Sequence, residues 1–275
     1  MKMKSLKKIL LYAVIIPSCI MVIVPIAWIV IASFSSGNSL YSDGSLFQKP
    51  TLDHYRELLG TTNFKLWYFN TVKIATANMI LSVFLSMGSA YVFSRFRFKG
   101  RKTALTTIMI LQMFPSMMGM IAIYILLSIL GLLDSHIGLI LVYAGGQIPF
   151  NTWLVKGYFD SISRSLDEAA KMDGASNLTI FIKVILPVTK PIITYLALTN
   201  FIAPWMDFML PQLLLRSEEK KTLAIALFSM ISGQQNTQFT NFASGAVMVA
   251  LPVTLLYVYL QKYIIVGLTA GSSKM

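Results

Sequence analysis

The side chains able to carry out acid–base, nucleophilic or metal chemistry are few in this sequence and far apart. The single cysteine, Cys19, lies inside an apolar run, which excludes an internal disulfide and any cysteine-rich metal site. The two histidines, His54 and His136, stand in separate polar stretches, unlike the clustered ligands of a metal site. These residues predict neither an enzyme active site nor a cofactor bound by this chain.

The polar stretch from Ser165 to Pro187 separates two long apolar stretches. Ser165 and Glu168 have the spacing of a capping box, which predicts a helix that begins there. Gly174 predicts the end of this helix, because glycine adopts a left-handed conformation without penalty. Asn177 can cap a second helix, which Pro187 interrupts. We therefore predict a short helix, a sharp turn and a second helix that returns to the membrane.

Composition places the chain among membrane proteins. Of its 275 residues, 56% are hydrophobic and 12% are charged, whereas a soluble globular protein carries about 25% charged residues. The net charge of +12 does not indicate nucleic-acid binding, because the basic residues flank apolar stretches instead of clustering with aromatic residues on a soluble face. We expect an all-α integral membrane protein.

Six apolar stretches predict six transmembrane helices, with a first helix and outside loop in residues 1–66, a core in 67–266 and a tail in 267–275. The predicted spans cover residues 9–34, 68–94, 103–130, 137–155, 188–210 and 244–260. The first span is longer than the apolar core of a typical signal peptide, which has about 7–15 residues. We interpret it as an uncleaved helix; a cleaved signal ending near Ser35 is the alternative.

Breaker residues predict irregularities in this arrangement. Pro115 predicts a kink in the third span, and Gly145 and Pro149 predict a bend in the fourth. The sequence LDHYRELL predicts a short surface helix in the first outside loop. The apolar stretch 223–231 is too short to cross about 30 Å of hydrocarbon, and we interpret it as a re-entrant or interfacial segment.

Positive charges predict the orientation of the chain. Most of the 23 Lys and Arg residues lie near the chain ends, in residues 95–102 and in the loop 156–187, and the positive-inside rule places such segments in the cytoplasm. Residues 95–102 hold five basic residues, which suits contact with anionic lipid. We predict that both termini and the loop 156–187 are cytoplasmic.

The sequence contains no nucleotide-binding loop of the form G-x-x-x-x-G-K-[ST]. Active transport by this chain would therefore draw its energy from a partner or from an ion gradient. Ion-coupled carriers bury ionisable residues in the membrane, at about 2.5–3.5 kcal/mol each. Asp207 is the one clear carboxylate within a predicted span, so an ion-coupled carrier is the less favoured alternative.

Several segments resemble the permease subunits of ABC importers. Glu168-Ala169-Ala170, Gly174 and Leu186-Pro187 are similar in order and spacing to the EAA loop of that family, with Val184 where the family usually has isoleucine. A plain connector between membrane helices is the alternative reading of this loop. Further segments resemble MalG-like subunits of maltose/maltodextrin-type importers: SRFRFKGRK at 94–102, MDGAS at 172–176, LLLR at 213–216, TLAIAL at 222–227, FASGAV at 242–247, ALP at 250–252 and GLTAG at 267–271.

The resemblance implies a type I permease fold and a chain that moves oligosaccharides across the cytoplasmic membrane of a prokaryote by alternating access. It implies a second, MalF-like permease, two copies of a cytoplasmic ATPase that carries ATP and Mg, and an extracytoplasmic sugar-binding protein. Another solute, such as a monosaccharide, polyol or glycerol phosphate, is the alternative. A membrane-embedded enzyme is not supported, because no His/Asp/Glu cluster faces one side of a predicted span. A structural scaffold is also possible, but it would not need the EAA spacing.

The resemblance also implies sites. Contact with the ATPase is expected at Glu168, Ala169, Ala170, Asp173, Gly174, Leu186 and Pro187. The tail residues Gly267, Leu268, Thr269, Ala270 and Gly271 are expected to reach between the ATPase subunits, although a frayed terminus would look the same. The loop 216–241 stands where the family contacts its binding protein. A sugar path needs aromatic faces and hydrogen-bonding groups, for which the candidates are Asn78, Gln112, Gln147, Asn151, Trp153, Asn200, Trp205 and Asp207.

Overall fold

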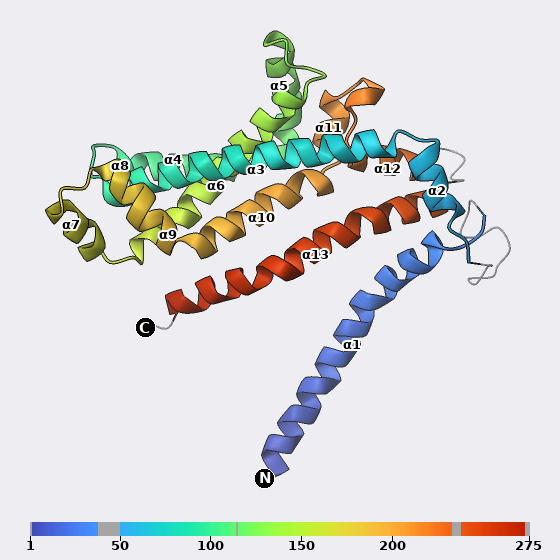
Figure 1. Ribbon diagram of the computed structural model, residues 1–275, viewed down its shortest axis with the longest axis horizontal. Helices are drawn as coiled ribbons and strands as arrows, with labels where there is room; N and C mark the ends of the chain where they lie inside the picture. The colour runs from blue at the N-terminus through green and yellow to red at the C-terminus, as the bar shows by residue number, and fades with distance from the viewer. Residues whose placement is uncertain (1, 38–49, 114, 233–237, 273–275) are drawn as a thin grey trace. The chain divides into compact units, whose positions relative to one another are not determined.

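A computed structural model describes residues 2–37, 50–113, 115–232 and 238–272 (Figure 1). Apart from one isolated β-bridge, every regular element in these ranges is a helix, which confirms the all-α prediction. The chain divides into two compact units: residues 1–65 with 226–252, and residues 66–225 with 253–275.

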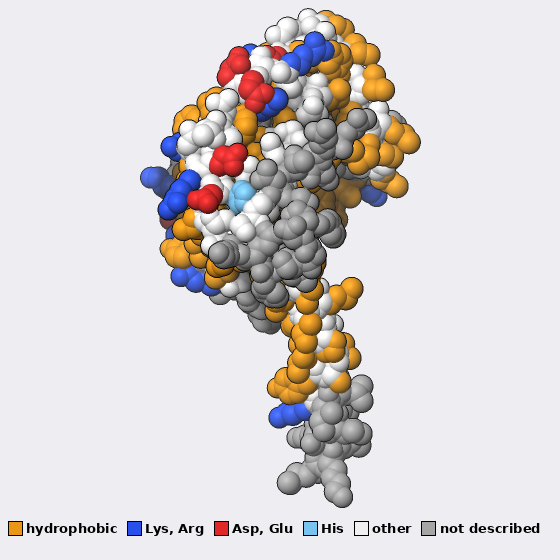
Figure 2. All heavy atoms as spheres, turned by 90° about the vertical axis from the view of Figure 1, so that its right-hand side faces the viewer, with side chains coloured by type: hydrophobic (Ala, Val, Ile, Leu, Met, Phe, Trp, Pro, Cys, Tyr) orange, Lys and Arg blue, Asp and Glu red, His pale blue; other side chains and the backbone are white. Residues whose placement is uncertain are grey.

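The first unit contains α1 (Lys2–Ser33), α2 (Asp53–Gly60), most of α12 (Leu223–Ile231) and the beginning of α13 (Phe239–Ser272). The most apolar 18-residue stretch within residues 11–33 of α1 has a mean hydropathy of 2.8, and none of its residues is buried inside the protein. Within this range only Ala32 and Ser33, at the end of the helix, are buried. Figure 2 shows this helix as an extended column of hydrophobic side chains. Such a surface is stable in lipid or against another chain, as expected for a membrane helix.

Polar contacts hold the ends of α1, α2 and α13 together in the first unit. His54 on α2 is buried, with Nδ1 2.8 Å from Oδ1 of Asn241 and Nε2 3.1 Å from the Ser35 carbonyl oxygen. The Ser244 hydroxyl donates to the Ser33 carbonyl at 2.9 Å. The short helix predicted in this loop is therefore observed as α2, and His54 anchors it.

The second unit contains the remaining helices. They are α3 (Phe64–Arg95), α4 (Arg101–Gln112), α5 (Ser116–Ile129), α6 (His136–Asp160), α7 (Ser165–Met172), α8 (Asn177–Ile180), the π-helical turn Phe181–Ile185, α9 (Leu186–Val188), α10 (Lys190–Met206), α11 (Met209–Leu214) and the 3₁₀ turn Glu218–Lys220. Figure 1 shows α7, α8 and α9 gathered at the end where α3 terminates.

Three helices in the described ranges are each long and apolar enough to cross a membrane: α1, α3 and α13. Two bent pairs would raise this number to five, namely α4 with α5, and the segment 177–188 with α10. The predicted span 137–155 lies in α6, which has 25 residues but does not belong to this set. The membrane character is thus confirmed, while six spans and cytoplasmic termini stay predictions.

Element ends differ from the predictions in two places. At Pro115 the chain breaks instead of kinking: α4 and α5 differ in direction by 103°, and extended Pro115 precedes the first turn of α5, since proline cannot donate the backbone bond that would continue α4. At the other end of the chain, α13 begins at Phe239 and continues to Ser272. The predicted tail segment 267–271 is therefore helical.

Candidate functional site

The predicted helix around the EAA sequence is present as α7, but the predicted capping box is wrong. The residue before the helix is Arg164, which already has helical dihedral angles and makes no side-chain cap bond. Its neighbour Ser163 accepts a hydrogen bond from the Ser165 N–H at 3.3 Å, and the Glu168 N–H donates to the Arg164 carbonyl at 3.0 Å. Helical geometry thus starts one residue earlier, so Ser165 cannot serve as the cap.

Gly174 ends α7 as predicted. Its φ is +81°, a left-handed conformation that favours glycine. The Gly174 N–H donates to the Lys171 carbonyl and the Ala175 N–H to the Ala170 carbonyl, both at 2.9 Å. These bonds satisfy carbonyls at the end of the helix and turn the chain sharply.

The second helix of the loop differs from the prediction at both ends. Ser176, not Asn177, is the cap: its backbone is extended and its hydroxyl accepts from the Thr179 N–H at 3.2 Å. Pro187 lies in the first turn of α9, where proline is tolerated, and the chain bends by 81° around Thr189 instead.

The loop rests on a hydrophobic cluster formed by α3, α6, α8 and α10. Its fully buried members include Phe159, Ile180, Ile185 and Leu196. Four partly buried residues of the loop pack against this cluster: Ala170, Ala175, Val184 and Leu186. Ala170 and Leu186 of the EAA sequence therefore attach the loop to the membrane helices.

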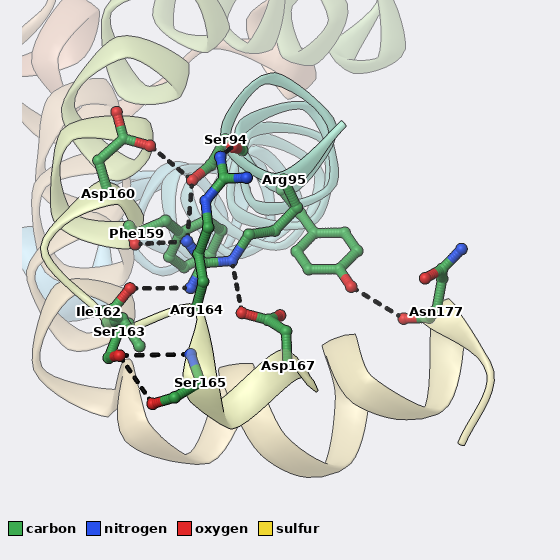
Figure 3. Close-up of polar contacts among 11 residues, drawn as sticks. Ser94, Arg95, Phe159, Asp160, Ile162, Ser163, Arg164, Ser165, Asp167 and Asn177 are labelled. Atoms are coloured by element: carbon green, nitrogen blue, oxygen red, sulfur yellow. Dashed lines mark hydrogen bonds and ion pairs between the residues drawn. The ribbon is translucent and has the colours of Figure 1, made fainter. Parts of the chain in front are cut away.

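Arg95, the last residue of α3, joins three elements (Figure 3). Its guanidinium donates to the carbonyls of Phe159 at 3.0 Å and Ile162 at 3.2 Å, and its Nε lies 3.0 Å from Oδ2 of Asp167 on α7. The last two atoms are too poorly aligned for a hydrogen bond, so the contact is an ion pair. The two side chains are only 8% and 12% exposed, so the pair holds the first turn of α7 against α3 and α6.

Neighbouring polar contacts reinforce this junction. The Arg164 guanidinium donates to the Ser94 carbonyl at 3.1 Å, and the Ser94 hydroxyl donates to Asp160 at 2.7 Å. The Tyr91 hydroxyl donates to the Asn177 carbonyl at 3.1 Å. Sequence analysis missed this junction. A basic residue that ends one span and an acidic residue beside the EAA sequence were the available signals.

The opposite face of the loop is open. Glu168, Ala169 and Asp173 are exposed, as are Gly174 and Pro187. Apolar side chains lie among them, with Met172 89% exposed and Leu178 66% exposed. Met172 on α7 and Leu178 on α8 give the loop an exposed apolar surface beside a carboxylate, which is typical of a surface that docks in a groove.

Four of the candidate sugar-path residues, on α3, α6 and α10, form hydrogen bonds with one another. The buried Asn78 amide donates to the Asn200 carbonyl at 2.8 Å and to Gln147 Oε1 at 3.1 Å. The Asn151 amide donates to Asn200 Oδ1 at 3.0 Å. Such bonds hold membrane helices together, so Asn78, Asn151 and Asn200 are engaged in packing in this conformation.

A cavity of about 860 Å³ lies between α5, α6 and the end of α10. Its wall is mainly apolar, with polar groups supplied by Tyr143, Gln147 and Asp207. The Tyr143 hydroxyl donates to Asp207 Oδ2 at 3.0 Å, and the Leu210 N–H donates to Asp207 Oδ1 at 3.3 Å. The structure thus brings Gln147 and Asp207 to one cavity, together with Tyr143, which sequence analysis did not select.

The other candidate sugar-path residues do not line this cavity, although Gln112 adjoins it through Gly146, which does. The Gln112 amide donates to the Gly146 carbonyl at 2.7 Å. Trp205 is buried, with its ring 5.4 Å from Tyr68 and 5.9 Å from Phe201. Trp153 is 47% exposed on α6.

Asp134, in the turn between α5 and α6, organises the beginning of the loop expected to contact a binding protein. Its Oδ1 accepts from the N–H groups of Arg216 at 2.8 Å and Ser217 at 3.0 Å, and its Oδ2 accepts from the Lys220 ammonium at 3.1 Å. Burial opposes ionisation, but the bonds from Ser217, Arg216 and Lys220 outweigh it and hold the pKa of Asp134 well below its usual range.

We expect Asp134→Asn to lower the free energy of unfolding of this region by about 1–3 kcal/mol at pH 7, the order of magnitude that hydrogen bonds to a charged group contribute. Because the folded-state pKa is depressed, this stabilisation is fully present above the unfolded pKa of about 3.9 and is lost progressively as the pH falls from that value toward the lower pKa of the folded state. The measurement is the unfolding midpoint between pH 7 and pH 3. Glu219→Gln, an exposed carboxylate in the same loop, is the control; an equal effect of both variants would contradict the prediction.

The predicted tail contacts lie in the last turns of α13, and the side chains of residues 264–272 fall outside the described part of the structure. Residues 233–237 of the loop 216–241 also lie outside it. Residues 223–231 form the nine-residue helix α12, and its re-entrant or interfacial position stays a prediction.

Comparison with known proteins gives consistent results. Residues 79–268 match the family described as binding-protein-dependent transport system inner membrane component. The chain is 44% identical over 258 residues to the galactooligosaccharides transport system permease protein GanQ of Bacillus subtilis, covering 93% of this chain and 91% of that protein. It is 41% identical over 271 residues to the maltodextrin transport system permease protein MdxG of the same organism, covering 98% of each. A bacterial ABC transporter involved in the import of the acidic polysaccharide alginate superposes on it with a TM-score of 0.84 at 27% identity, covering 96% of this chain and 98% of that one.

Proposed function

This chain belongs to the family of binding-protein-dependent transport system inner membrane components, and from this membership we propose that it forms half of the translocation path of an oligosaccharide importer. GanQ and MdxG, its relatives, are named for galactooligosaccharides and maltodextrin. We infer that its own cargo is a neutral oligosaccharide of this kind and that it works in a bacterial inner membrane.

The open face of α7 carries the proposal. Glu168, Ala169 and Met172 are exposed, whereas Asp167 and Ala170 on the opposite face are held by Arg95 and the hydrophobic cluster. In our proposal the open face docks in a groove of a cytoplasmic ATPase. The small Ala169 permits close approach, and Glu168 pairs with a basic residue of that ATPase. ATP and Mg bind to the ATPase and not to this chain.

The way the loop is attached supports our proposal of alternating access. Any displacement of α7 is transmitted to the ends of α3 and α6 through the Arg95–Asp167 ion pair, and to α10 through the continuous segment that follows Ser176. The same three helices are joined near their middle by the Asn78–Asn200 contacts. We propose that they move as one body against a second, MalF-like permease, driven by two ATPase copies and gated by a sugar-binding protein.

For the sugar path we favour the cavity at Tyr143, Gln147 and Asp207, because it combines apolar walls with groups that bind hydroxyls. Gln112, Trp153 and Trp205 are less favoured, because none of them lines this cavity. The residues Gly267, Leu268, Thr269, Ala270 and Gly271 are proposed to contact the ATPase subunits from the C-terminus of α13.

Purification of the tagged chain from its native membrane tests this proposal. We expect a second permease and an ATPase to co-purify in a fixed ratio of one of each permease to two ATPases. In liposomes with ATP on the ATPase side, the complex should take up radiolabelled maltodextrins or galactooligosaccharides only when the binding protein is added. Uptake without ATP hydrolysis, or purification of the chain alone in an active state, would refute the proposal.

A further inference from the structure

A second cavity, of about 510 Å³, lies where the turn between α3 and α4 faces the end of α6. Cationic side chains from both segments line it: Arg97, Arg101 and Lys102 from the turn and the start of α4, and Lys156 from α6. No carboxylate is among the described residues that line it. Other residues form the hydrophobic cluster beneath α7 and the cavity at Tyr143, Gln147 and Asp207.

One acidic group lies beside this cavity and must be counted. Asp160, at the end of α6, forms an ion pair with Lys156 and accepts a hydrogen bond from Ser94. It also interacts electrostatically with Arg101. The carboxylate neutralises one of the four cations, so the cavity keeps an excess of positive charge that favours an anion.

The backbone adds a second attraction for an anion. The 12-residue helix α4 begins at Arg101, and Gly100 precedes it in a left-handed conformation, with φ +84° and no side-chain cap bond. The Arg101 N–H donates to the Phe98 carbonyl at 3.4 Å, and no side chain caps the helix. The positive end of the helix dipole at this N-terminus favours a nearby anion such as phosphate.

The remaining wall of the cavity contains two large apolar side chains beside the polar Thr103. Phe98 and Leu105 line it beside the cations, and the Phe98 ring is 44% exposed and packs 5.7 Å from the ring of Phe93. A free phosphate ion would gain nothing from these side chains, whereas the glycerol and the first methylene groups of a lipid would cover them. We propose that the phosphate of an anionic phospholipid occupies this cavity, held by Arg97, Arg101, Lys102 and Lys156.

Native mass spectrometry of the intact transport complex with added phosphatidylglycerol tests the site. We expect Arg101→Gln and Lys102→Gln each to weaken lipid retention about fivefold, the usual effect of one cation at an anionic membrane surface. The matched control is Lys99→Gln, which removes the same charge from the same turn but does not line the cavity; we expect it to retain lipid as the natural protein does. Lys102 is exposed, so its replacement leaves folding intact.

Two further arms distinguish the source of the anion. Phosphatidylcholine should not be retained, and inorganic phosphate at millimolar concentration should not displace phosphatidylglycerol. Displacement by phosphate would assign the cavity to a free anion and overturn the lipid proposal. Equal losses in Lys99→Gln and Arg101→Gln would show attraction by the whole turn and would also overturn it. The readout is independent of sugar uptake, so its outcome does not depend on the proposed transport function.

Discussion

Proline in place of Gly174 is expected to reduce ATP-driven uptake at least about tenfold while the protein still inserts in the membrane. Proline holds φ near about −65° and has no N–H, whereas Gly174 has a φ of +81° and donates a hydrogen bond to Lys171. The turn between α7 and α8 cannot form, so the open face of α7 loses its position. If the correct position of α7 is destabilised by more than about 1.4 kcal/mol, the fraction of protein with α7 correctly placed falls more than tenfold.

Two further changes in the same loop separate geometry from charge. Gly174→Ala has open space for its Cβ and costs only the left-handed strain of about 1–2 kcal/mol, so a partial loss of uptake is expected. Glu168→Lys leaves the backbone intact but reverses the charge on the exposed face, and it should abolish coupling if Glu168 pairs with a basic residue of the ATPase.

The matched control for strain is Gly131→Ala. Gly131 has a φ of +65° and open space around its Cβ, but it lies in the turn after α5, far along the chain from α7. This variant should hydrolyse ATP and take up sugar as the natural protein does. Uptake and ATP hydrolysis are measured together in liposomes, and normal coupling in both Gly174→Pro and Glu168→Lys would refute the role of this loop.

Removal of one partner of the Arg95–Asp167 ion pair is expected to have a comparable effect by a different route. Loss of a single partner leaves the other charge buried without compensation, which costs about 3–5 kcal/mol. Arg95→Met should be the more damaging change, because it also deprives the Phe159 and Ile162 carbonyls of their donors. Asp167→Leu should loosen the first turn of α7 and lower coupling at least about tenfold.

A double-mutant cycle isolates this contribution. In Arg95→Met with Asp167→Leu no buried charge is left unpaired, so the double variant should be closer to the natural protein than the sum of the single changes predicts. Asp53→Asn is the control, because the Arg56–Asp53 pair is 77% and 74% exposed, and such pairs contribute about 0–1 kcal/mol. The measurements are thermal unfolding and the ratio of sugar uptake to ATP hydrolysis; strictly additive effects would mean that the two residues act separately.

Local features of the chain were predictable from the sequence for a physical reason. Hydrophobic stretches and breaker residues act over a few residues, so the all-helical membrane character, the helix α7 and the turn at Gly174 followed from spacing alone. The start of α7 was predicted at a Ser165 cap, whereas helical geometry already begins at Arg164, and the second cap was predicted at Asn177 instead of Ser176. Neighbouring serine and asparagine side chains compete for the same backbone N–H groups, so spacing alone does not select one of them.

The sequence by itself determined that this is a helical membrane protein with an EAA-type loop, and its segments identified the family. Only the tertiary structure decided which side of that loop is held and which is open. Arg95 and Asp167 meet across more than seventy residues of chain, and Asn78, Asn151 and Asn200 come from three helices. The spacing of residues along the sequence does not predict such pairings. They depend on how the helices cross and on which polar groups find partners once water is excluded.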